Sequence, residues 1–348
     1  MMLSKKALLG YSLGPIGSSI LSLMLIPVMA WGLSSDRVAD YSLLTILCSI
    51  FLLFSTFGAD QYMIRNYHSS ENKDLLLNES LSVSLVFSFL LVFILFSFDL
   101  VNLISFSDEI KFDGVLKLAF IILIANINRF FATLLRLQES AIQYSITNLI
   151  PKFVFLFSIV FISVYEYSVS LDVLLNIILF GVLSNFLTMQ CFFKFRLIKK
   201  IKINLGKFKC VISYGVPMLF SGLAYWGLQA TDRLMLSELA DREELAIYSI
   251  AIQMAGLAML VQSVISIIWT PLALKVISNS EGELSTNFEK KVEEVSLLFG
   301  KLILLVLLLV NMFSWLVPYF LPATYNDIYK ILTLCMLPPL LYALSECT

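Results

Sequence analysis

Long apolar stretches, separated by short polar and charged segments, recur along the whole chain. A stretch of roughly 20 apolar residues is the length that an α-helix needs to cross a bilayer core about 30 Å thick. None of the stretches alternates apolar and polar residues with a period of two, as membrane β-strands do. Since only helices and closed barrels satisfy all backbone polar groups in lipid, the pattern predicts an all-α polytopic membrane protein.

The apolar stretches between charged residues predict about ten transmembrane helices. They cover residues 12–33, 41–64, 79–104, 115–136, 145–164, 171–193, 210–236, 245–274, 296–317 and 328–345. The first stretch follows Lys5 and Lys6 and so imitates a secretory signal. Its length, its internal Gly and Pro residues and the many stretches that follow favour an uncleaved helix instead.

Lysine and arginine are distributed unevenly over the polar segments. With the amino terminus in the cytoplasm, most of the 24 basic residues fall on the cytoplasmic side. The exceptions, on the outer side, are Arg37, Lys111, Lys117, Arg233, Arg242 and Lys330. Because cytoplasmic segments carry the excess of Lys and Arg, we expect a multi-pass protein of a cytoplasmic membrane with both termini cytoplasmic.

Composition supports lipid as the main solvent. Of the 348 residues, 59% are hydrophobic and 14% are charged, whereas about a quarter of the residues in a soluble domain are charged. The net charge of -1 is less informative than the distribution of Lys and Arg between the two sides of the membrane, and no nucleic-acid function follows from it. The five cysteines lie in apolar segments or at their basic ends, so we expect them to be reduced.

Two pairs of similar segments indicate an internal repeat. Tyr11-Ser12-Leu13-Gly14-Pro15, at the start of the first span, is similar to Ser213-Tyr214-Gly215-Val216-Pro217, at the start of the seventh. Ala39-Asp40-Tyr41-Ser42 is likewise similar to Ala246-Ile247-Tyr248-Ser249 at the start of the eighth. Six helices in the first repeat, an even number, would make the repeats parallel, which is a transporter architecture.

The repeat predicts two lobes joined by a linker. We expect an N-terminal lobe of six helices at 1–193, a basic cytoplasmic linker at 194–209 and a C-terminal lobe of about four helices at 210–348. The basic residues of the linker suit an orientation signal that rests on anionic lipid headgroups. Capture of a substrate phosphate is the alternative.

Polar residues within the predicted spans share helix faces. One face of the fourth span carries Asn126, Arg129, Thr133 and Arg136, and one face of the fifth carries Asn148 and Lys152. The seventh span carries Gly222, Trp226, Gln229 and Arg233 on one face, with Asp232 beside them. The second span carries Ser49, Thr56 and Asp60 on one face. An ionisable group in a membrane is costly unless it faces protein or water. The faces therefore predict a wet cavity lined by Arg129, Asn126, Lys152, Asn148, Trp226, Gln229 and Arg233.

Several of these charges have simpler alternatives. Lys152, Arg136 and Arg65 lie near the cytoplasmic boundary and could extend to the headgroups. Asp60 and Arg65 could form a structural ion pair, and Asp232 with Arg233 a local pair. Arg129 lies about one and a half turns deeper than the boundary, which favours a cavity-facing position.

Patterns of catalysis are missing from the sequence. The sole histidine, His68, has no cluster of Cys or carboxylate residues at metal-ligand spacing around it. The sequence contains neither a phosphate-binding glycine loop nor a nucleophile elbow. We therefore expect no enzyme, no metal site and no cofactor.

Gly58-Ala59-Asp60-Gln61-Tyr62-Met63-Ile64-Arg65 resembles the Gly-x-Asp-Gln-x-x-x-Arg pattern of bacterial O-antigen flippases of the Wzx type. Tyr214-Gly215-Val216-Pro217, Asp232-Arg233-Leu234-Met235-Leu236 and Tyr248-Ser249-Ile250-Ala251 are similar to further segments of that family. The family belongs to the multidrug/oligosaccharidyl-lipid/polysaccharide (MOP) exporter superfamily.

The resemblance implies a MATE-like fold of two lobes around a central cavity. The implied cargo is an undecaprenyl-pyrophosphate-linked oligosaccharide, an O-antigen or related repeat unit, which crosses the bacterial inner membrane by alternating access. Asp60, Arg65 and Asp232 then become candidates for coupling or gating. The candidate hinge residues are Gly14, Pro15, Gly215 and Pro217. Candidate partners besides the cargo are membrane lipid, a polysaccharide polymerase, a chain-length regulator and a coupling ion, H⁺ or Na⁺.

Members of this family usually carry twelve spans, so ten would leave the second lobe incomplete. Two other function classes stay open at the level of sequence. A MATE-like drug or cation antiporter would prefer carboxylates in its cavity, and the deep basic groups argue against it. A membrane glycosyltransferase or polymerase would be expected to show a long outer loop with clustered acidic or arginine residues.

Overall fold

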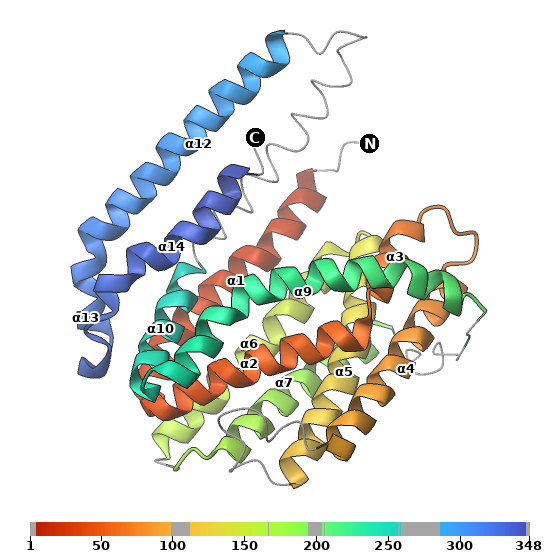
Figure 1. Ribbon diagram of the computed structural model, residues 1–348, viewed down its shortest axis with the longest axis horizontal. Helices are drawn as coiled ribbons and strands as arrows, with labels where there is room; N and C mark the ends of the chain where they lie inside the picture. The colour runs from red at the N-terminus through yellow and green to blue at the C-terminus, as the bar shows by residue number, and fades with distance from the viewer. Residues whose placement is uncertain are drawn as a thin grey trace. The chain divides into compact units, whose positions relative to one another are not determined.

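The computed structural model describes residues 5–98, 112–165, 167–193, 204, 206–256, 258 and 286–345, and this part of the chain is helical without a strand (Figure 1). It divides into two compact units. The first comprises residues 1–21 and 32–245, and the second comprises residues 22–31 and 246–348.

Most of the long helices belong to the first unit. They are α2 (Ser35–Thr56), α3 (Ala59–Asn66), α4 (Lys73–Phe98), α5 (Phe112–Leu137), α6 (Ala141–Val164), α7 (Leu171–Phe192) and α9 (Phe208–Leu239). Helices α1 (Lys5–Gly32) and α10 (Arg242–Ala255) contribute residues to both units. The second unit holds α12 (Thr286–Phe313), α13 (Val317–Phe320), α14 (Ile328–Ser345) and the short 3-10 helices Ser314–Leu316 and Ala323–Tyr325.

The prediction of a multi-pass membrane protein is confirmed by helix length and hydropathy. Within the described residues, seven helical segments are long and apolar enough to cross a membrane: Ser35–Thr56, Lys73–Ser97, Phe112–Leu137, Ala141–Val164, Leu171–Phe192, Phe208–Leu239 and Ser296–Phe320. Gly17–Gly32 and Ile328–Tyr342 are shorter apolar helices. Most of the predicted span 245–274 lies outside the described residues. The count of ten spans, the repeat lobes and the sidedness of the termini stay predictions.

The prediction of a single helix over residues 41–64 is wrong, because the helix breaks at Phe57 and Gly58. Helix α2 begins earlier, at Ser35, and ends at Thr56, and α3 begins at Ala59. The two residues between them, Phe57 and Gly58, adopt left-handed backbone angles with φ of 46° and 69°. Left-handed residues cannot continue a right-handed helix, so the chain changes direction here.

A buried polar network joins α2, α4 and α5. The hydroxyl oxygen of Ser84 lies 2.8 Å from the Ser55 carbonyl oxygen and 2.9 Å from Oδ1 of Asn126. Asn126 Nδ2 donates to the Ser88 hydroxyl at 2.6 Å, and the hydroxyls of Ser55 and Ser88 are also hydrogen-bonded. In lipid, where apolar contact alone gives helices little reason to associate, such hydrogen bonds help to hold them together.

In the second unit, α12 packs against α14. Ile328 and Leu340 of α14 are buried, whereas Leu304, Leu305 and Leu308 of α12 are exposed. Such exposed leucines on a long apolar helix suit contact with lipid. Trp31, from the end of α1, donates from Nε1 to the Phe320 carbonyl at 3.0 Å and ties this part of α1 to α13.

Candidate functional site

A polar cavity of about 380 Å³ lies within the first unit. Helices α2, α3, α5, α6 and α7 all contribute to its wall. Its polar and charged lining residues are Asp60, Gln61, Asn128, Arg129, Thr133, Arg136, Tyr144, Thr147, Asn148 and Asn185. Polar and ionisable residues among membrane-spanning helices are costly, so a cavity lined by so many of them is a candidate functional site.

An ion pair between α3 and α5 forms part of the cavity wall. Nε and Nη2 of Arg129 lie 2.9 Å and 2.8 Å from the same carboxylate oxygen, Oδ2 of Asp60. The Asp60 side chain is 4% exposed and the Arg129 side chain 41% exposed. The carboxylate of Asp60 is therefore buried, whereas the guanidinium of Arg129 remains partly exposed.

Helix α5 supplies the basic side of the cavity. Arg129 and Arg136 are seven residues apart, which separates their backbone positions by about 10.5 Å along one helix face. Thr133 lies between them, and all three line the cavity. The shared face expected from their spacing is thus present. Asn126, expected on the same face, is fully buried and instead bonds to the serines of α4.

Neutral polar groups of α6 form another part of the wall. Tyr144, Thr147 and Asn148 line the cavity together with Pro151. Because proline has no backbone N–H, the Thr147 carbonyl loses the donor that a regular helix would supply. Lys152, predicted beside Asn148, donates from Nζ to the Ser18 carbonyl of α1 at 2.9 Å and is not among the lining residues.

Two asparagines that sequence reasoning missed complete the wall. Asn128 on α5 donates from Nδ2 to the Val182 carbonyl at 2.9 Å, and Asn185 lies on α7. Both line the cavity, and Oδ1 of each is a buried acceptor without a hydrogen-bond partner among the described residues. An amide inside an apolar span was the available signal for both.

The polar face predicted for the seventh span packs against α2 instead of lining this cavity. Trp226 donates from Nε1 to the Ser49 hydroxyl at 3.1 Å, and Arg233 Nη1 approaches the Ser42 hydroxyl at 3.5 Å. Arg233 Nη2 also donates to the Gln229 carbonyl at 2.8 Å. Residue numbers rise along α9 from Trp226 to Arg233 while those of their partners on α2 fall from Ser49 to Ser42, so the two helices are antiparallel (Figure 1).

Gly215 lies where α9 crosses the break between α2 and α3. A Cβ added to Gly215 would lie 2.1 Å from the Phe57 carbonyl oxygen, and one added to Gly58 would lie 2.9 Å from the Gly215 Cα. The two glycines therefore allow the backbones to touch. Among the other hinge candidates, Pro217 lies within α9, and Gly14 and Pro15 lie within α1 in a stretch whose side-chain surroundings are not described.

The remaining gating candidates, Arg65 and Asp232, make contacts outside the cavity wall. The guanidinium carbon of Arg65 lies 5.2 Å from the centre of the Tyr214 ring, so Arg65 faces α9 while Asp60 pairs with Arg129. Oδ1 of Asp232 accepts the backbone N–H of Arg233 at 2.8 Å.

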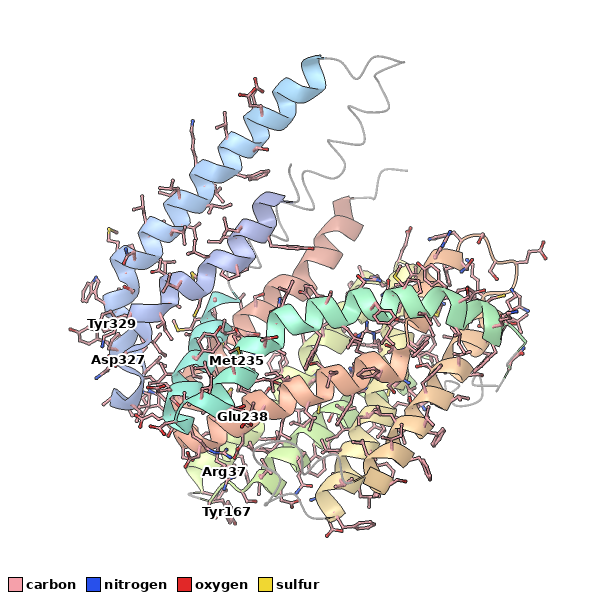
Figure 2. The ribbon with its side chains drawn as sticks, viewed as in Figure 1. Arg37, Tyr167, Met235, Glu238, Asp327 and Tyr329 are labelled. Atoms are coloured by element: carbon pink, nitrogen blue, oxygen red, sulfur yellow. The ribbon has the colours of Figure 1, made fainter. Side chains whose placement is uncertain are left out.

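A second ion cluster lies at the opposite end of α2. The buried carboxylate of Asp40 pairs with Arg37 at 2.8 Å and with Arg242 of α10. Figure 2 shows Arg37, near the start of α2, at the same end of the helix pair as Glu238, near the end of α9. Sequence reasoning missed this cluster, although the spacing of three residues between Arg37 and Asp40 was a signal.

Metal-ligand clusters are missing from the described part of the chain, where no three His, Cys, Asp or Glu residues group together. His68 is exposed, and Cys48, Cys191, Cys210 and Cys335 are free thiols. Cys347 lies outside the described residues.

Comparison with known proteins identifies the family. The model of a family described as polysaccharide biosynthesis protein matches residues 5–281, a stretch that contains every residue of the cavity wall. No curated protein and no solved structure matches the chain. The match covers most of the sequence and includes the Gly58 to Arg65 segment. The chain therefore belongs to the polysaccharide biosynthesis protein family, the Wzx-like flippases of the MOP exporter superfamily.

Proposed function

We propose that the chain moves an oligosaccharide linked to undecaprenyl pyrophosphate across the bacterial inner membrane. The observation that carries the proposal is the cavity of the first unit, which presents two arginines and a series of amides and hydroxyls among apolar helices. Family membership supports an oligosaccharide-lipid cargo. A headgroup of this kind combines anionic phosphates with many sugar hydroxyls. Its site therefore needs cationic groups for the phosphates and neutral hydrogen-bonding groups for the sugars.

The arginines suit the pyrophosphate. A guanidinium stays charged and can hold two phosphate oxygens at once with its planar fork. Since Arg129 and Arg136 lie on one face of α5 and line the same cavity, their long side chains can converge on one pyrophosphate. The lipid tail stays in the bilayer while the headgroup occupies the polar cavity.

The neutral part of the wall suits the sugars. Asn148 and Asn185 offer amide donors and acceptors, and Thr147 and Tyr144 offer hydroxyls, all of which bond well to a polyhydroxylated ring. A volume of about 380 Å³ also falls within the range of small-molecule sites. The cavity would then hold the phosphates together with the sugar nearest to them.

The predicted orientation gives the direction of transport. The cavity lies beside the α2–α3 break, the second half of α5 and the first half of α6. With the amino terminus in the cytoplasm, these segments belong to the cytoplasmic side. Cargo would therefore enter from the cytoplasmic leaflet and leave toward the outer leaflet by alternating access.

The cavity favours an anionic cargo over the cationic cargo of a drug antiporter. The one carboxylate among its lining residues, Asp60, is already paired with Arg129, and Arg136 adds a second positive charge. A cation would meet net repulsion at such a wall.

Substitution of Arg129 tests the proposal. In liposomes, purified protein should move a lipid-linked oligosaccharide between leaflets and leave it chemically unchanged. Arg129→Ala should abolish this movement at normal protein abundance, and Arg129→Lys should restore only part of it, because lysine lacks the planar fork. Lys117→Ala is the matched control, since Lys117 lies at the other end of α5 and pairs with Asp172 of α7.

Three outcomes would contradict the proposal. Normal movement by Arg129→Ala would remove this residue from the site. Equal losses of movement in Arg129→Ala and Lys117→Ala, both at normal abundance, would show that the loss is not specific to the cavity. Elongation or cleavage of the sugar by the wild-type protein would assign the chain to the glycosyltransferases or polymerases.

A further inference from the structure

Resting on the proposed function, we propose that Asp60 is a positioning residue that competes with the cargo for Arg129. While the cavity is empty, the carboxylate of Asp60 holds the guanidinium against α3. When the cargo enters, a phosphate of its headgroup replaces Asp60 on the guanidinium. Asp60 would thereby set how tightly the headgroup is held and how readily it leaves.

The contact between the two side chains leaves room for this exchange. A guanidinium has five N–H donors, and Arg129 directs two of its nitrogens to Oδ2 of Asp60. The third nitrogen, Nη1, takes no part in this contact, and the Arg129 side chain remains 41% exposed in a residue that lines the cavity. A phosphate can therefore approach Arg129 before the bond to Asp60 is lost.

Competition requires that Asp60 should be buried while Arg129 remains accessible to the cargo, and the exposed fractions of the two side chains fit this requirement. With Arg129 in place the Asp60 side chain is 4% exposed, so this carboxylate depends mainly on protein groups and little on water for its partners. Losing Arg129 leaves Asp60 with the Gln61 amide, whose Nε2 lies 3.2 Å from the same oxygen. A buried carboxylate without its ion partner is unfavourable, and this penalty opposes binding of the phosphate. Without such opposition, the two arginines would hold the pyrophosphate more tightly and release it more slowly.

The exchange also changes how α3 is held. Asp60 lies in the first turn of α3, directly after the break at Phe57 and Gly58, where the backbone touches Gly215 of α9. Loss of the Asp60–Arg129 bond removes the polar tie between the start of α3 and α5, whereas Ala59 and Met63 of α3 stay in one buried apolar cluster with Phe130 of α5. Cargo binding at α5 would thereby change the contacts of the α2–α3 break, which touches α9 at Gly215.

Removal of the charge of Asp60 tests the inference. Asp60→Asn keeps the size and an acceptor oxygen but no longer competes as an anion. Purified Asp60→Asn protein in nanodiscs should bind undecaprenyl pyrophosphate about tenfold more tightly than wild type, and in liposomes it should turn over its cargo more slowly. A merely structural role of Asp60 would instead weaken binding or lower abundance.

Two control variants isolate the effect. Asp172→Asn removes another carboxylate that pairs with a cation of α5, namely Lys117, and should leave the affinity unchanged. In the Asp60→Asn and Arg129→Ala double variant the tightening should disappear, because Asp60 acts through Arg129. Tightening that persists in the double variant, or an affinity of Asp60→Asn equal to or weaker than that of wild type, would overturn the inference.

A measurement on the wild-type protein covers the case in which Asp60→Asn does not accumulate. Hydrogen exchange of the backbone amides in the first turn of α3 should become faster when undecaprenyl pyrophosphate binds, since this turn loses its ion pair with α5. Slower or unchanged exchange in α3 would overturn the inference. If wild type neither binds the pyrophosphate lipid nor moves the oligosaccharide lipid, the proposed function fails. Binding and transport without this change in α3 contradict only the role of Asp60.

Discussion

A methyl group added to Gly215 should push α9 away from the break between α2 and α3. The Cβ of alanine would lie 2.1 Å from the Phe57 carbonyl oxygen, whereas ordinary van der Waals contact begins at 3.4 Å. The difference between these distances is 1.3 Å, and the nearest obstacle is backbone that cannot rotate away. Either α9 retreats or the left-handed turn at Phe57 and Gly58 is distorted.

The free-energy cost follows from two opposing terms. Overpacking of a close contact typically costs about 1–3 kcal/mol. Replacement of a glycine by alanine inside a helix returns roughly 0.5–1 kcal/mol through helix propensity. Because the obstacle is backbone, we expect an overpacking cost near the upper end of this range and a net destabilisation of about 2 kcal/mol, with some loss of the Trp226 to Ser49 hydrogen bond farther along the same helix pair.

Thermal unfolding of purified protein in detergent measures this change. Gly215→Ala should lower the apparent melting temperature by several degrees. Gly227→Ala is the matched control on the same helix, because the nearest atom to its added Cβ is the Thr231 hydroxyl at 4.0 Å. It should leave the melting temperature unchanged or slightly raised. Equal melting temperatures for the two variants would refute the close contact between Gly215 and Phe57.

Two further predictions concern the other end of α2 and the orientation of the chain. Asp40→Asn should lower the free energy of unfolding by about 1–3 kcal/mol, because it removes the buried carboxylate that Arg37 and Arg242 share. Asp36→Asn is the control, since Asp36 is not part of this cluster. Equal losses of stability in the two variants would contradict the reasoning. A cysteine introduced at Glu243 should react with an impermeant thiol reagent added from the outside, whereas one at Lys73 should react only after permeabilisation; reversal of either result would overturn the predicted orientation.

Helical spacing predicts which residues share a face when they all lie on the same helix. The positions of Arg129, Thr133 and Arg136 follow from the geometry of α5, and all three line the cavity. Asn126 departs from this face because Ser84 and Ser88 of α4 bind its amide. Which partner captures an amide depends on helix packing, and a single sequence does not contain this information.

The break after α2 could not be read from hydropathy either. Residues 41–64 are apolar enough for one helix, and glycine alone does not end a helix in a membrane. The left-handed angles at Phe57 and Gly58 accompany a contact with Gly215, more than 150 residues away in the sequence. For the same reason the sequence left a pair of Asp60 with Arg65 open, whereas in the structure Asp60 pairs with Arg129.

The cavity wall draws on a short part of the gene. All lining residues lie between Leu52 and Asn185, so one uninterrupted coding segment specifies the chemistry that would meet the cargo. Under the proposed function, recombination that exchanges this segment between related genes would transfer cargo preference in a single event. Variation in the sugars of a bacterial surface could then arise without coordinated changes in distant parts of the reading frame.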